Sequence, residues 1–218
     1  MPIVWTMDGD ENSWAEWSNA MAQSGASPLA QELLADIHAG QKKVALDVGC
    51  GTGRAFLPLQ QAGFKIIGFD PVMAGLRASR KHCEKDHLSL SIMCATASQI
   101  PLQSSSIDLV LAIGILFHLS SYELDLTLQS IRRVMKPGGE AILHFLDLQD
   151  WRRSLANAIQ PEQVLVPSYK AVVTSFCSQD ILGDRLASNR LKIKSLQLKT
   201  KETERGTQYD WIACCVIK

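Results

Sequence analysis

The residues with the clearest chemical meaning form a glycine-rich loop near the start of the chain. Gly49, Gly51 and Gly53 follow the apolar run 44–48, which has the composition of a buried strand. From Arg54 the spacing of apolar residues becomes helical. A strand, a loop with almost no side chains and a helix start form a ligand cradle. Backbone can approach a ligand closely there, and the first amides of the helix are free to bind it.

Two acidic residues flank this loop where a carboxylate can hold a ligand. Asp47 stands just before the loop, where it can attract a cationic group. Asp70 ends the next strand-like segment, 64–70, close to the separation of roughly 20 residues expected between the loop and an acid that binds a ribose. Its two oxygens can accept hydrogen bonds from two vicinal hydroxyls. The alternative role for Asp70 is to cap the following helix.

The glycine spacing argues against a dinucleotide. Such a site requires Gly-x-Gly-x-x-Gly. Counted from Gly49, the third glycine is replaced by Arg54, and counted from Gly51 it is replaced by Phe56. A nicotinamide oxidoreductase is therefore disfavoured, and titration with NADH would test that alternative.

The segment Leu46-Asp-Val-Gly-Cys-Gly-Thr-Gly53 closely resembles motif I of the class I S-adenosylmethionine-dependent methyltransferases. Three further segments follow in the family's order: Ile100-Pro-Leu102, Ile107-Asp-Leu-Val110 and Lys136-Pro-Gly-Gly139. The resemblance is strong over 44–146 and moderate over the last two strands. Together these motifs are a far more specific signal than the glycine loop alone.

The resemblance implies S-adenosyl-L-methionine as the cofactor, a ligand that carries a sulfonium and an ammonium group. It implies cofactor contacts from Asp47, Gly49, Cys50, Gly51, Asp70, Pro71, Thr96, Ala97 and Ile113. Thr96 departs from the family, which commonly has an acidic residue there beside the adenine amino group. Thr96, Ser98 or backbone near Ala97 would have to accept that hydrogen bond instead.

His118 is the candidate catalytic residue. It lies in the segment 114–119, where many family members have Val-Leu-His-His-Leu. It could be a structural histidine, or it could be a general base or acceptor-orienting group at the rim of the site. No Ser or Cys nucleophile is needed, because the sulfonium methyl is itself electrophilic. No metal site is expected, since no Cys/His cluster has zinc spacing.

The composition narrows the class of protein. The chain has 218 residues, with 22 Lys+Arg and 22 Asp+Glu, and its formal net charge is zero. This balance gives no electrostatic argument for nucleic acid. The six cysteines form no Cys-x-x-Cys pair. They are expected to be free thiols, which favours a reducing compartment. With no apolar run of about 18 residues and no leader pattern, we expect a cytoplasmic protein without a membrane span.

The pattern predicts an α/β fold, with strands at 44–48, 64–70, 88–94, 107–113, 140–146, 191–196 and 209–217. Helices are expected at 11–24, from Ser27-Pro28 to near Gly40, from Arg54 through Leu59, at 72–86, 121–134 and near 178–186. A charged turn is expected at 199–206. Asp108 is expected to be structural, and His82 and His87 to lie on the surface. With the resemblance, this predicts a Rossmann-like, seven-stranded, mostly parallel sheet with helices on both faces and an antiparallel C-terminal hairpin.

We expect a single domain over 1–218. Residues 1–40 would form a helical cap, 41–146 the cofactor-binding core, 147–189 a substrate-side insertion and 190–218 the hairpin. The tryptophans Trp5, Trp14 and Trp17 either pack the N-terminal helices onto the body or cap the mouth of the site. The resemblance implies methyl transfer to a small-molecule acceptor. The alternative is a non-catalytic module that binds the cofactor or a protein. Acids, quinones, amines, thiols and a protein side chain all remain open as acceptors, and so does the oligomeric state.

Overall fold

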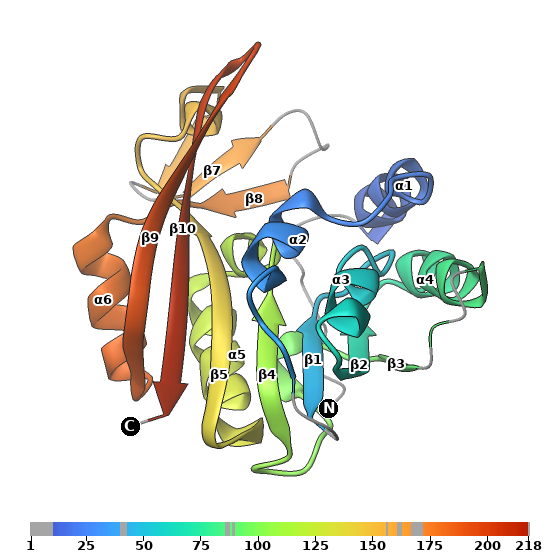
Figure 1. Ribbon diagram of the computed structural model, residues 1–218. Coiled ribbons are helices and arrows are strands. Elements are labelled where there is room, and N and C mark those ends of the chain that lie inside the picture. The colour runs from blue at the N-terminus through green and yellow to red at the C-terminus, as the bar shows by residue number, and fades with distance from the viewer. Residues whose placement is uncertain are drawn as a thin grey trace, which may run out of the picture.

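The computed structural model describes residues 11–39, 43–85, 88, 90–155, 157–160, 163–166 and 172–217. Seven strands form one sheet in the order β3-β2-β1-β4-β5-β10-β9 (Figure 1). Their bounds are β1 Val44–Val48, β2 Lys65–Asp70, β3 Leu90–Cys94, β4 Ile107–Ala112, β5 Met135–Leu146, β9 Leu191–Thr203 and β10 Gly206–Ile217. Strand β10 is antiparallel to both of its neighbours, and the other pairs are parallel. The predicted fold class is confirmed.

The parallel arrangement brings the candidate acids to one edge of the sheet. Strand β1 lies between β2 and β4, and Asp47 is in register with Gly68 of β2 and Leu111 of β4. Asp70 is the last residue of β2. Parallel strands end at the same edge, and the strand order reverses between β1 and β4. A crevice outside these ends is where open α/β sheets bind ligands.

The opposite edge is tied together by Asp108, near the start of β4. Its Oδ2 accepts hydrogen bonds from the backbone nitrogen of Val44 at 2.9 Å and from Nζ of Lys136 at 2.7 Å. One carboxylate thus links the starts of β1, β4 and β5. The prediction of a structural role for Asp108 is confirmed.

Helices cover both faces of the sheet. Their bounds are α1 Glu11–Met21, α2 Pro28–Leu34, α3 Phe56–Gln61, α4 Met73–Lys85, α5 Ser121–Val134 and α6 Gln179–Ser188. Helices α2, α3 and α4 share an apolar cluster with one face, which includes Phe56 and Leu111. Helices α5 and α6 share another with the opposite face, which includes Leu128 and Val110. Within the described part of the chain, no helix is both long and apolar enough to cross a lipid bilayer.

The helix ends follow from local capping. Ser27 caps α2 by accepting from the backbone nitrogen of Ala30 at 3.3 Å, but the helix ends at Leu34 rather than near Gly40. Helix α5 spans the predicted residues, and it begins with a capping box in which Ser120 and Glu123 bond each other's backbone. The family-like segment after it does more than stop the helix, since β5 begins at once with Met135.

The predicted charged turn at 199–206 is wrong in extent. Strand β9 continues to Thr203 and β10 begins at Gly206, so the turn is confined to Glu204 and Arg205. Lysines and threonines along this segment can stay exposed on an edge strand while their backbone pairs with β10. Trp151 packs close to Gly206, where an added Cβ would lie 2.7 Å from the Cβ of the tryptophan.

The segment 147–189 contains strands that its pattern does not predict. A short 3₁₀ helix, η3 (Trp151–Leu155), precedes the strands β6 (Asn157–Gln160), β7 (Gln163–Val166) and β8 (Val172–Ser175), which form a small antiparallel sheet. Each of these strands has four residues, too few for a clear alternation. Figure 1 shows this small sheet and α1 at the same end of the large sheet, where β1, β4 and β5 finish.

Candidate active site

The glycine loop has a backbone that other residues would strain. Gly49, Gly51 and Gly53 all have positive φ, at 67°, 50° and 81°. A Cβ at Gly53 would also lie 2.6 Å from the ring of Phe56. The loop is anchored by the backbone nitrogen of Cys50, which donates to the carbonyl of Phe69 at 2.9 Å. The strand, loop and helix predicted from the sequence are therefore present, and the helix begins at Phe56 rather than Arg54.

Asp70 is held against this loop by two backbone donors. Its Oδ2 accepts from the nitrogen of Gly51 at 2.9 Å, and its Oδ1 accepts from the nitrogen of Val72 at 2.8 Å. The residue is 8% exposed. Burial raises the pKa of Asp70 above its ordinary value of 3.8, and the two donors reduce that rise. The second bond is the helix-start role considered above, but each oxygen keeps acceptor capacity for a ligand.

Asp47 lies beneath the loop and is 4% exposed. Burial, and then the nearby charge of Asp70, raise the pKa of Asp47 from 3.8 to about 8. Such a shift means that the ionised form lacks compensating positive charge in the ligand-free protein. A cationic ligand group placed beside it would supply that charge. This is the electrostatic signature expected of a site for an ammonium or sulfonium compound.

A cavity opens over these residues. Its lining comprises Trp14, Trp17, Ser18, Ser27, Ala30, Asp47, Gly49, Cys50, Gly51, Thr52, Arg54, Ala55, Asp70, Pro71, Val72, Ile113, Gly114 and Ile115. Seven of the nine predicted cofactor contacts are therefore brought together around one space. Thr96 and Ala97 are not part of this lining as far as the structure describes the chain. Their role beside the adenine stays a prediction.

Trp14, Trp17 and Thr52 are among the lining residues that were not predicted as cofactor contacts. Trp14 and Trp17 come from α1, and their position favours the cap interpretation over simple packing; Trp5 lies outside the described residues. Thr52 is 1% exposed, and its Oγ1 has no hydrogen-bond partner among the described residues. A buried hydroxyl without a partner costs free energy, so a ligand is expected to satisfy it. The glycines around Thr52 were the only sequence signal for its position.

His82 is half-buried rather than the surface residue that the sequence predicts. Nδ1 of His82 lies 2.8 Å from the carbonyl oxygen of Thr52, and Nε2 of His82 lies 2.7 Å from that of Ala22. The half-buried ring thus joins the glycine loop to the connection after α1. The other histidine predicted at the surface, His87, lies outside the described residues.

His118 lies in an aromatic row rather than on the cavity wall. It belongs to the short 3₁₀ helix η2 (Leu116–His118), directly after β4. Its ring centroid is 4.9 Å from that of Trp14 and 4.5 Å from that of Phe117, and it is half-buried. Trp14 links His118 to the cavity. The proposed catalytic role of His118 stays a prediction.

The sequence profile of the methyltransferase domain matches residues 46–143. Two ubiquinone biosynthesis O-methyltransferases, from Bradyrhizobium diazoefficiens and Nitrobacter winogradskyi, are 29% and 30% identical over 150 residues. The match covers 68% of this chain and 58% and 56% of theirs. Residues 46–143 therefore form a methyltransferase domain of the class I S-adenosylmethionine-dependent type. The chain spans little more than half the length of the curated relatives it matches.

Solved methyltransferase structures share this fold. A methyltransferase from Methanosarcina mazei aligns with a TM-score of 0.72 at 19% identity, covering 88% of this chain and 97% of its own. The 1,6-didemethyltoxoflavin-N1-methyltransferase from Burkholderia thailandensis, solved with its substrate and S-adenosylhomocysteine, aligns at 0.69 and 16% identity, covering 95% and 84%. In this methyltransferase family the cofactor is S-adenosylmethionine. Its positive charge could compensate the carboxylate of Asp47, which has no cationic partner among the causes of its pKa shift.

Proposed function

We propose that this methyltransferase transfers the methyl group of S-adenosylmethionine to a small-molecule acceptor. The observation that carries the proposal is the cavity in which the positive-φ glycine loop, Asp70 and the uncompensated Asp47 converge. These features together match a nucleoside that carries a sulfonium group and an amino-acid tail. The glycine loop exposes its backbone, Asp70 can bind a ribose, and Asp47 lacks a cationic partner.

Each part of the cavity suits one part of that cofactor. Asp70 would accept from the ribose hydroxyls, because its orientation is already fixed by the loop and helix amides. Asp47 would face the cationic end, with the loop from Gly49 to Gly51 against the same end. Ile113, Gly114 and Ile115 provide a wall after β4. Thr52 offers a hydroxyl whose hydrogen bond remains to be made.

The chemistry asks little of the protein beyond placement. S-adenosylmethionine supplies an activated methyl group, so the chain has to align an acceptor in line with the carbon–sulfur bond. It also has to exclude water while charge disperses in the transition state. We assign exclusion of water to Trp14 and Trp17. We further propose that 1–40 caps the site and that 147–189 lies on its acceptor side. Of these segments, residues 1–10, 40, 156, 161–162 and 167–171 lie outside the described part of the chain.

The proposed partners and location follow from the same features. An apolar, partly enclosed cavity suits a small molecule better than a nucleic acid, for which the chain has no excess positive charge. None of the six cysteines forms a disulfide, which favours a reducing compartment such as the cytoplasm.

Isothermal titration with S-adenosylhomocysteine tests the cofactor assignment. Replacing Asp70 by Ala should weaken binding at least about tenfold, since charge-assisted hydrogen bonds contribute roughly 1.5–3 kcal/mol. The matched control is Asp184→Ala, which removes an exposed carboxylate on α6 and should leave the affinity unchanged. No binding by the unaltered protein would refute the proposed function, and equal affinity of the two variants would refute the role of Asp70.

A further inference from the structure

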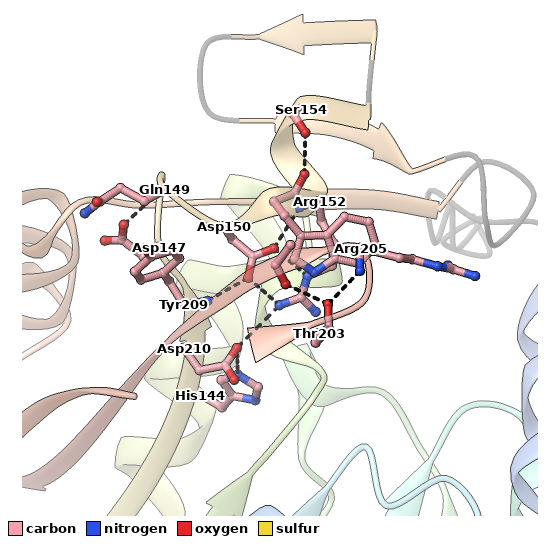
Figure 2. Close-up of polar contacts among 12 residues, drawn as sticks. His144, Asp147, Gln149, Asp150, Arg152, Ser154, Thr203, Arg205, Tyr209 and Asp210 are labelled. Atoms are coloured by element: carbon pink, nitrogen blue, oxygen red, sulfur yellow. Dashed lines mark hydrogen bonds and ion pairs between the residues drawn. The ribbon is translucent and has the colours of Figure 1, made fainter. Parts of the chain in front are cut away.

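A buried network of charged residues lies beyond the end of β5, outside the cofactor cavity (Figure 2). The Nε and Nη2 of Arg152 each lie 2.7 Å from an oxygen of Asp150, and Nη2 also lies 3.4 Å from Oδ1 of Asp210. Asp150 further accepts from the backbone nitrogen of Tyr209 at 2.9 Å. Arg152 is thus occupied by two carboxylates and is not available to an anionic acceptor.

The network ends in a histidine. His144, on β5, is 7% exposed, and its Nε2 lies 3.1 Å from Oδ1 of Asp210. This contact is at ion-pair distance but off the line of an ideal hydrogen bond, as unliganded sites often are. Nδ1 is buried and has no hydrogen-bond partner in the described part of the chain. Figure 2 shows the ring below Asp210 with this second nitrogen turned away from the carboxylate.

The nearby carboxylate of Asp210 favours one tautomer of His144. An Nε2–H that faces Asp210 leaves Nδ1 with the free lone pair when the ring is neutral. A carboxylate that fixes a ring in this way prepares the other nitrogen to accept a proton, as in catalytic triads. A buried lone pair without a donor is costly, so a ligand donor is the natural partner of Nδ1.

Sheet geometry places His144 one strand away from a residue of the cavity wall. Ala112 of β4 is in register with Leu143 of β5, so the next residues, Ile113 and His144, project from the same face one strand apart. Ile113 lines the cavity. Ile142, which shares the face of His144, belongs to the apolar cluster against which Ile113 packs.

Aromatic contacts make a second connection. The ring of Phe117 lies 5.2 Å from that of His144 and 4.5 Å from that of His118, which in turn lies 4.9 Å from Trp14. The row therefore runs from the cavity wall to His144. It provides flat apolar surface on the side of β4 away from β1, where an acceptor beside the cofactor would lie.

We propose that His144 is the general base of the methyl transfer and that the acceptor is the hydroxyl of a phenol. This inference rests on the proposed function. As the acceptor oxygen bonds to the methyl carbon, the carbon–sulfur bond breaks and its electron pair passes to sulfur, which gives S-adenosylhomocysteine. The hydroxyl proton moves to Nδ1 of His144, and the imidazolium later releases it to solvent.

Asp210 and Arg152 are positioning residues for this step. Burial alone would raise the pKa of Asp210, but His144 and Arg152 outweigh it and hold that pKa below its ordinary value of 3.8. Asp210 therefore stays ionised beside the ring. Together Asp150, Asp210 and Arg152 carry one net negative charge, which protonation of His144 neutralises. The network thus stabilises the imidazolium formed in the reaction.

A pair of acceptors of different acidity tests the base. Catechol keeps its proton near neutral pH, whereas 4-nitrocatechol is largely ionised and needs no base. His144→Gln should lower kcat for catechol by about 10²–10⁴-fold, the usual contribution of a general base, and change kcat for 4-nitrocatechol by less than about fivefold. The control His38→Gln changes an exposed histidine after α2 and should affect neither substrate.

Asp210→Asn tests the positioning role, because an amide can donate to Nε2 and move the proton to Nδ1. It should reduce catechol turnover and spare 4-nitrocatechol. Nuclear magnetic resonance of ¹⁵N-labelled histidine should show His144 as the Nε2–H tautomer, with an Nδ1 signal that shifts when catechol is added to the complex with S-adenosylhomocysteine.

The outcomes separate this inference from the proposed function. If S-adenosylhomocysteine binds but the unaltered protein methylates neither catechol, the phenol assignment is wrong. Equal losses for both catechols, or an unchanged His144 resonance, would overturn the role as a base. Failure of S-adenosylhomocysteine to bind at all would instead overturn the proposed function. Binding of S-adenosylhomocysteine by each variant confirms that it is folded.

Discussion

The two halves of the site are built in different ways. On the side of β1 and β2, main-chain amides of a continuous loop and two strand-end carboxylates form the surface. On the side of β4 and β5, side chains from distant segments meet, as His144 does with Phe117 and Asp210. The first construction is set by local backbone geometry and tolerates little change. The second depends on the identity of side chains that come from distant segments.

Among changes to either half of the site, substitution of Asp47 should have the largest effect on the free energy of unfolding. Its folded pKa of about 8 exceeds its ordinary value of 3.8, so the folded state binds more protons over this range. Stability of the ligand-free protein should therefore fall as pH rises from about 4 to 8, by at most about 1.4 kcal/mol per unit. Asp47→Asn removes this dependence. Urea unfolding of both proteins at pH 5 and pH 8 measures it, and parallel profiles would contradict the assignment.

The same carboxyl group predicts how cofactor affinity depends on pH. Below pH 8 a cationic ligand has to displace a proton from Asp47, so affinity for S-adenosylmethionine should rise as pH approaches 8. Titration in buffers of different ionisation enthalpy should show net proton release near pH 7. Asp47→Asn should bind more weakly and lose most of that release, whereas retention of full proton release would point to another group.

Backbone strain makes the next prediction. Gly53→Ala places a Cβ 2.6 Å from the ring of Phe56 at a φ of 81°, which should cost roughly 1–3 kcal/mol and weaken S-adenosylhomocysteine binding. Gly183→Ala is the control, because it lies inside α6 with open space around it and should gain about 0.5–1 kcal/mol. Thermal unfolding and titration with S-adenosylhomocysteine compare the stability and affinity of the two variants. Equal values for both would contradict the importance of the loop backbone.

His82→Leu should have a smaller effect, because it removes two bonds that join the loop to the segment after α1. The expected loss is about 1–2 kcal/mol in the free energy of unfolding, and cofactor affinity should fall several-fold. Hydrogen exchange at Thr52 and Ala22 would report local opening, and unchanged exchange would count against this link.

Trp14→Ala should give the smallest effect and should act on the acceptor side. Removing an edge-on ring contact with His118 is expected to cost about 0.5–1.5 kcal/mol, seen as a raised KM for the acceptor. Tyr122→Ala, which removes a 74% exposed aromatic side chain on α5, is the control. If Trp14→Ala weakened cofactor binding and left the KM for the acceptor unchanged, Trp14 would contact the cofactor alone.

The same contrast explains what could be predicted from the sequence. The glycines, Asp47 and Asp70 are close in sequence or end neighbouring strands, so their convergence followed from strand order. The contact of His144 with Asp210 joins residues on β5 and β10 that no local pattern relates. His82 and the extent of β9 were misjudged for the same reason, since carbonyl partners and strand pairing come from other parts of the chain.

The position of α1 also has a kinetic consequence. Trp14 is at once part of the cofactor cavity and the first ring of the row that leads to His144. A nucleoside seated against that indole completes the chamber for the second substrate, so turnover should follow a compulsory order with the nucleoside arriving first. Its spent form should depart last.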